Sequence, residues 1–163
     1  MEFRMTPRFQ RIVDFIVSMT NYECSMNSHV SFLWNGGTIL SYGKSIPLTQ
    51  YSMWPSIHAE HDCLRKFNFK NRTKKRKRRA FLLFVLRLDR EGNWKNSKPC
   101  QHCLKLLKQY RISKVIYSRD DGTFFGEFVN YMNQNDCIIS QGFKLRRHVN
   151  SSTQGKTSAS KEM

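Results

Sequence analysis

The run of residues 80–88, AFLLFVLRL, limits the folds open to this chain more than any other segment. It is almost continuously apolar, which is typical of a β-strand that is buried on both faces. A strand of that kind needs other secondary structure packed against both of its sides. The run therefore predicts the central strand of a layered α/β domain.

Patterns before this run predict the first elements. Apolar residues at helical spacing predict an amphipathic helix over residues 9–19. Two strand-like runs at residues 29–34 and 38–42 are joined by Asn35-Gly36-Gly37, and Asn-Gly supplies the positive φ values that a tight hairpin turn demands. Residues 43–56 contain two prolines and predict a loop.

The second half of the chain continues the alternation of helices and strands. We expect a helix from about Ile57 to Phe69, a helix over 99–110 with Pro99 in its first turn, and strands over 115–118 and 123–128 separated by a turn at 120–122. Residues 130–149 fit a helix followed by a short extended piece at 137–145. This order predicts an α/β domain whose later strands are parallel and whose sheet is covered by helices.

The length of 163 residues fits one domain, which we assign to residues 1–149, with a basic loop at 70–79 and a disordered tail at 150–163. The formal net charge is +16, and residues 70–79 contribute +8 of it, which leaves +8 on the remainder. Such basicity favours a polyanionic or phosphorylated partner. The stretch 72–79, RTKKRKRR, fits contact with nucleic acid, a nuclear import signal or a solvated loop.

The cysteines bear on the compartment. There are five, an odd number, and no N-terminal segment has the pattern of a secretory signal. No run approaches the ~20 apolar residues that a membrane span requires. We therefore expect an intracellular protein, cytoplasmic or nuclear, with no membrane partner. In a reducing compartment a Cys-x-x-Cys pair indicates metal or redox chemistry.

Two short motifs carry the chemistry. His58-Ala59-Glu60 places an imidazole and a carboxylate at the start of one predicted helix, and Cys100 and Cys103 lie at the start of another. One imidazole and two thiolates suit tetrahedral Zn²⁺ and leave a fourth position for water, whose pKa zinc lowers to near neutral. Such a water could displace an amine from a ring substrate. Glu60 would accept the proton of that water and deliver protons to the ring and to the leaving amine. These residue types predict a catalytic zinc site.

Each part of this constellation also has a less specific interpretation. A Cys-x-x-Cys pair alone is a structural zinc half-site or a redox pair about as often as it is catalytic, and His58 with Glu60 favours catalysis. A ligand from His61 or His102 would close the fourth position, so we expect neither to bind the metal. The three remaining cysteines lack metal spacing and are expected to be small buried side chains: Cys24, Cys63 and Cys137.

His-x-Glu followed by Pro-Cys-x-x-Cys is a highly specific zinc-deaminase signature, and the chain resembles the cytidine and deoxycytidylate deaminase superfamily from about His29 to Phe128. The resemblance implies a three-layer, cytidine-deaminase-like α/β domain with a mixed sheet of about five strands covered by helices. It implies zinc as the cofactor. It also implies a site built from three metal ligands and one acid/base: His58, Cys100 and Cys103, with Glu60.

The resemblance also suggests which residues meet the substrate. Many relatives have Gly-x-Asn where this chain has Gly43-Lys44-Ser45, and the Asn contacts sugar or base. Ser45, at the place of that Asn, and Ala59, between the two motif residues, are therefore candidate substrate contacts. The interval of 38 residues between Glu60 and Pro99 favours the nucleotide branch of the superfamily.

Two further residues are candidate contacts on chemical grounds. Trp54, four residues before His58, fits stacking on a base, although an aromatic side chain beside a core commonly packs there instead. Arg119 follows a predicted strand at the carboxyl edge where α/β sheets bind ligands, so it fits either a phosphate contact or an ion pair with Asp120 or Asp121.

Three functions are compatible with these features. The leading one is zinc-dependent hydrolytic deamination of a cytosine nucleoside or nucleotide, dCMP-like or CMP-like, to the uracil form with release of ammonia. The second is deamination of cytosine or adenine in single-stranded DNA or RNA, which the net charge would guide into the site. The third is a non-catalytic, zinc-stabilised module that binds nucleic acid. A homo-oligomer is compatible with all three.

Overall fold

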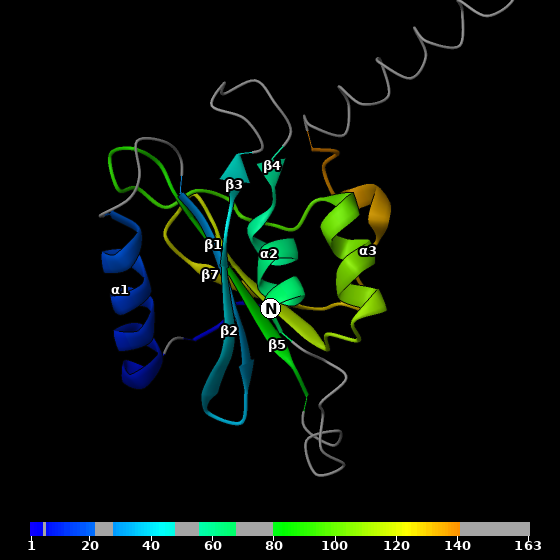
Figure 1. Ribbon diagram of the computed structural model, residues 1–163, viewed down its shortest axis with the longest axis horizontal. Coiled ribbons are helices and arrows are strands. Elements are labelled where there is room, and N and C mark those ends of the chain that lie inside the picture. Colours follow the sequence, from blue (N-terminus) through cyan, green and yellow to red (C-terminus); the bar gives the residue numbers. More distant parts are fainter. Residues whose placement is uncertain (5, 22–27, 48–55, 68–79, 141–163) are drawn as a thin grey trace, which may run out of the picture.

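The computed structural model of the protein describes residues 1–4, 6–21, 28–47, 56–67 and 80–140. A mixed sheet of five strands, in the order β2-β1-β5-β6-β7, forms its centre. Helix α1 (Pro7–Asn21) covers one face, and α2 (Ala59–Lys66) and α3 (Gln101–Gln109) cover the other (Figure 1). The predicted three-layer α/β architecture is confirmed.

The strands of the main sheet are β1 (Ser28–Asn35), β2 (Thr38–Lys44), β5 (Leu82–Leu88), β6 (Lys114–Ser118) and β7 (Phe124–Phe128). A separate pair of short antiparallel strands, β3 (Ile46–Pro47) and β4 (Ser56–Ile57), leads into α2. A 3-10 helix, η3 (Gln134–Asp136), follows the sheet.

Strand β5 lies at the middle of the sheet, as its apolar sequence predicts. It pairs with β1 in antiparallel and with β6 in parallel orientation. Its side chains alternate between two cores, because successive residues of a strand point to opposite faces. Phe84 and Leu86 pack in the core beneath α1, whereas Leu83 and Val85 pack in the core beneath α2 and α3.

The hairpin between β1 and β2 is confirmed, but its turn lies one residue later than the sequence suggested. Asn35 still pairs with Thr38 in the ladder, and the positive φ values belong to Gly36 (55°) and Gly37 (91°). A two-residue turn with positive φ at both positions follows the twist of the strands, and glycine adopts it without strain. The side chain of Asn35 is buried and donates to the carbonyl of Ala80.

The predicted direction of the last strand was wrong. Of the later strands only β5 and β6 are parallel, and β7 is antiparallel to β6. A short turn that ends at Gly122 (φ 79°) joins β6 to β7, and such a connection can only reverse the chain. Parallel strands need a longer crossover, which α3 supplies between β5 and β6.

Several predicted boundaries also move. The segment expected as a loop from residue 43 still belongs to β2 up to Lys44. Helix α2 begins at Ala59 and ends at Lys66, inside the predicted limits, and α3 begins two residues after Pro99. Of the ambiguous segment 130–149, residues up to 140 form turns and η3 without a regular helix. The loop at 70–79 and the tail at 150–163 lie outside the described residues.

Candidate metal centre

The starts of α2 and α3 supply the clustered side chains. His58 and Cys100 are the residues immediately before the two helices, and both have extended backbones, with φ and ψ of −71° and 151° and of −72° and 168°. Their carbonyls accept the first helical hydrogen bonds, from Asp62 and Leu104. Neither side chain caps its own helix, so both remain available to a ligand.

Three of the predicted site residues lie together. The Nδ1 atom of His58 is 3.5 Å from the Sγ of Cys100 and 3.3 Å from the Sγ of Cys103. The ligand atoms of all three lie within 4.8 Å of one another, and no other such group of three occurs in the described ranges. One nitrogen and two sulfurs fit tetrahedral zinc with one position left open. The donor set therefore fits the metal that the sequence predicted.

The two cysteines share a proton when no metal is bound. The hydrogen bond with Cys103 lowers the pKa of Cys100 to about 4, with further help from His58 against the effect of burial. The same bond, together with burial, holds the pKa of Cys103 well above its ordinary value. Cys100 is thus the thiolate and Cys103 the thiol of the pair. Because metal ligands must be deprotonated, zinc binding is expected to release the Cys103 proton.

The imidazole of His58 is drawn into the same network. Its hydrogen bond with Cys100 raises its pKa, and the negative charges of Glu60 and Cys100 add to that effect, while burial opposes it. The protonated ring is therefore favoured beside the thiolate. A zinc ion would replace this proton as well, so metal affinity is expected to fall as the pH is lowered.

Glu60 lies in the first turn of α2 and is buried, with 6% of its surface exposed. Burial raises the pKa of its carboxyl group, and the positive charge of His58 and a hydrogen bond from Cys103 partly offset this. The raised pKa moves titration of the carboxyl group towards neutral pH. A carboxyl group with such a pKa can both accept and donate a proton during a reaction.

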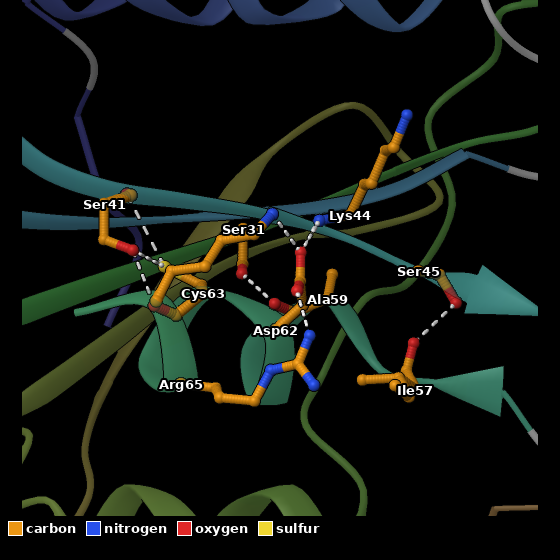
Figure 2. Close-up of polar contacts among 10 residues, drawn as sticks. Ser31, Ser41, Lys44, Ser45, Ile57, Ala59, Asp62, Cys63 and Arg65 are labelled. Carbon is orange, nitrogen blue, oxygen red and sulfur yellow. Dashed lines mark hydrogen bonds and ion pairs between the residues drawn. The ribbon is translucent and has the colours of Figure 1, made fainter.

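Helix α2 is fixed to the sheet by polar contacts along its first five residues (Figure 2). The hydroxyl of Ser31 donates to the carbonyl of Ala59 at 2.7 Å, and that of Ser41 donates to the carbonyl of Cys63 at 2.5 Å. The buried carboxylate of Asp62 accepts from the backbone N–H of Lys44 and forms an ion pair with Lys66 at 2.6 Å. These contacts hold the start of α2, and with it His58, at one place above β1 and β2.

Gly43 lets β2 approach α2 closely, and this gives a prediction. A Cβ atom at Gly43 would overlap the backbone nitrogen of Cys63 and the backbone oxygen of Ala59, neither of which can move alone. We expect Gly43→Ala to lower the free energy of unfolding by ~1–3 kcal/mol, measured by chemical denaturation. Gly126→Ala is the control, because its Cβ would meet the flexible end of Lys114. Equal stability of the two variants would contradict this packing.

The predicted substrate contacts have different surroundings. Ser45 lies beside the site, since its hydroxyl donates to the carbonyl of Ile57, the residue before His58 (Figure 2). Ala59, the first residue of α2, is fully buried. Arg119 is exposed and its guanidinium lies over the ring of Phe125, 5.8 Å from the centroid. Trp54 lies outside the described residues.

The remaining histidines and cysteines agree with the sequence analysis where the structure describes them. His61 and His102 contact each other, with ring centroids 6.3 Å apart, and neither belongs to the ligand cluster. Cys63 and Cys137 are buried in the core beneath α2 and α3, as expected. Cys24 lies outside the described residues.

Sequence reasoning missed two residues beside the centre. His29 of β1 and Arg87 of β5 are direct cross-strand partners on the face of the sheet that carries α2. The signal was present, because Arg87 is the one charged residue within the apolar run 80–88. The face of the sheet to which Arg87 points became evident only once the pairing of β5 with β1 was known.

Comparison with known proteins assigns the family. The model of the cytidine and deoxycytidylate deaminase zinc-binding region matches residues 15–119, which include both motifs and make up more than half of the chain. The chain belongs to this family. The cytidine and deoxycytidylate deaminase resemblance and the expectation of a zinc-dependent deaminase are thereby confirmed. No curated protein sequence matches the chain significantly.

Solved structures of one relative resemble this member of the cytidine and deoxycytidylate deaminase family. The dCMP deaminase of cyanophage S-TIM5 in complex with dCMP and dUMP is 17% identical, with a TM-score of 0.46 over 70% of this chain and 83% of that one. Its apo form is 19% identical, with a TM-score of 0.46 over 69% and 84%. Separately, none of the helices in the described ranges is long and apolar enough to cross a membrane.

Proposed function

We propose that this family member catalyses the hydrolytic deamination of a cytosine mononucleotide, dCMP or CMP, to the uracil nucleotide and ammonia. The observation that carries the proposal is the cluster of His58, Cys100 and Cys103 with a buried carboxyl group, that of Glu60, in the adjoining helical turn. A structural zinc site would complete its ligand set with a fourth protein side chain. Within the described residues this group has three protein ligands.

In the proposed site His58, Cys100 and Cys103 hold the zinc ion. When bound, zinc acts as a Lewis acid that makes water nucleophilic at neutral pH. His58 and Cys100 immediately precede α2 and α3, and Cys103 lies in α3. Both helices pack on the same face of the sheet, so the site is built on rigid elements. The first turn of α2 carries Glu60 two residues beyond His58, close to the cluster without being part of it.

The proposed role of Glu60 is to move the protons of the reaction. A C–O bond forms between water and C4 of cytosine, and the C4–N bond of the exocyclic amine breaks. Glu60 takes a proton from the attacking water and delivers it to the ring nitrogen N3. It then takes the remaining proton of the new C4 hydroxyl group and transfers it to the departing amine, so that the C4=O bond of uracil forms. Water and cytosine thus become uracil and ammonia, and the carboxyl group ends in its starting state.

The charge of the chain supports a phosphorylated substrate. The net charge of +16 attracts phosphate, and half of it lies outside residues 70–79. Ser45 and Arg119 remain proposed contacts, Ser45 because of its bond beside His58 and Arg119 because its exposed guanidinium follows the end of β6. The same charge is also the observation that favours the second candidate function, deamination within single-stranded nucleic acid.

Initial rates on a substrate panel separate these functions. Zinc-loaded full-length protein is incubated with dCMP, CMP, deoxycytidine, cytidine and single-stranded DNA and RNA oligonucleotides, at several salt concentrations. We expect the highest kcat/KM with a mononucleotide and a shallow dependence on salt, because a mononucleotide meets few cations. A preference for an oligonucleotide, with a steep loss of rate as salt rises, would contradict the mononucleotide assignment.

A further inference from the structure

His29 and Arg87 lie side by side on the sheet. They are directly opposed residues of the antiparallel strands β1 and β5, so their side chains point to the same face. Val30 and Leu86, their neighbours along each strand, pack in the core beneath α1. Because side chains alternate along a strand, His29 and Arg87 face the opposite side, which carries the candidate metal centre.

Backbone contacts bring this pair next to the start of α2. The carbonyl of His29 accepts from the N–H of Ser45 at 2.9 Å, and the hydroxyl of Ser45 donates to Ile57, which precedes His58. Arg87 is joined to the segment that leads to Cys100, since its carbonyl accepts from the N–H of Lys95 at 2.9 Å. The pair therefore lies between the segments that deliver the ligands from α2 and α3.

The Nε atom of Arg87 lacks a protein partner where one is expected. Its Nε atom is buried and has no hydrogen-bond acceptor, and no carboxylate in the described part of the chain forms an ion pair with it. A buried charged donor without an acceptor is costly and rare in folded proteins. An unsatisfied guanidinium Nε beside a candidate catalytic centre is explained when a ligand supplies the missing acceptor.

Charges of both signs surround His29, and the positive ones have the larger effect on its pKa. Burial, and then the charges of Arg87 and His58, lower the pKa of His29 to about 4, so its imidazole is neutral at physiological pH. A neutral imidazole can still donate one N–H to an oxygen atom. The pair thus offers one guanidinium and one neutral donor, and no carboxylate of the described residues forms an ion pair with the guanidinium.

We infer that Arg87, with His29 beside it, contacts the phosphate of the nucleotide substrate and makes the enzyme prefer nucleotides to nucleosides. This inference rests on the proposed function and names the group that reads its phosphate. The planar guanidinium presents N–H donors that match two phosphate oxygens at once, whereas a Lys ammonium acts as a point charge. Arg87 is thereby a specificity-determining residue, separate from the metal ligands and from Glu60.

Kinetics on matched substrates test this role. Arg87→Gln is expected to lower kcat/KM for dCMP roughly 10- to 100-fold, the usual effect of losing a hydrogen-bonded charge pair, and to change that for deoxycytidine less than about 3-fold. Arg87→Lys should retain part of the preference. The control is Arg90→Gln, which removes the same charge from an exposed turn and should change neither rate. Equal losses on dCMP and deoxycytidine would overturn the inference.

Binding of the products provides a test that does not depend on turnover. By calorimetry, zinc-loaded wild-type protein should bind dUMP at least about 10-fold more tightly than deoxyuridine, and Arg87→Gln should remove most of this difference. Thermal unfolding of each variant checks that it is folded. If the wild type binds the two products equally, the inference is wrong whatever the variants do. Tight dUMP binding without deamination would instead contradict the proposed function and leave the phosphate contact supported.

Discussion

Replacing Glu60 with glutamine is expected to lower kcat on dCMP by roughly 100- to 10,000-fold, the range that general acid and base catalysis contributes. Glutamine has nearly the same shape and can still form hydrogen bonds, but it cannot take up the proton of the attacking water. Glu60 is buried and lies outside the ligand cluster, so its replacement should not expel the metal.

The measurement is steady-state kinetics combined with the zinc content of each protein. Glu60→Gln should keep one zinc per chain and a folded state similar to that of the wild type. Glu91→Gln is the matched control, because Glu91 is an exposed residue of the turn after β5 and its loss should leave kcat unchanged. A Glu60→Gln protein with more than about a tenth of the wild-type kcat would rule out the proton-transfer role.

Removing a ligand should have the second large effect. We expect Cys103→Ser to lose zinc and, with it, deaminase activity, because two protein ligands cannot hold the ion as firmly as three. Changes outside the ligand set already lower metal affinity or activity by roughly 10- to 100-fold, so the loss of a ligand should exceed this. Elemental analysis after dialysis measures the retained zinc.

A second cysteine shows whether the effect is specific. Cys137 is buried in the core beneath α2 and α3 but is not one of the clustered ligands. Cys137→Ser should therefore keep its zinc and lose only stability. A chelator should lower the melting temperature of the wild type and of Cys137→Ser, since bound metal stabilises the folded state, and should leave that of Cys103→Ser unchanged. Full zinc occupancy in Cys103→Ser would contradict the ligand assignment.

The elements that could be predicted from sequence are those with a strong local pattern. The apolar run 80–88 required burial on both faces, and β5 indeed lies at the centre of the sheet between two cores. The turn residues after β1 and the spacing of Cys100 and Cys103 are similarly local signals. For the centre, residue types, their spacing and the zinc-deaminase signature together predicted which three ligand side chains would meet.

The features that could not be predicted depend on contacts between distant segments. The starts of α2 and α3 both fall two residues later than expected, because His58 and Cys100 take extended backbones. Nothing in the sequence around Gly43 reveals that the backbone of α2 passes directly against it. The partnership of His29 and Arg87 likewise follows from the register of β1 with β5, which no local pattern specifies.

One measurement tests the central claim most directly. Full-length protein with one zinc per chain is incubated with dCMP, and dUMP and ammonia are quantified in the same sample over time. We predict that dUMP and ammonia appear in equal amounts, that chelation stops the reaction and that zinc restores it. Failure of the zinc-loaded, folded protein to form dUMP from dCMP would contradict the claim that this centre deaminates a cytosine nucleotide.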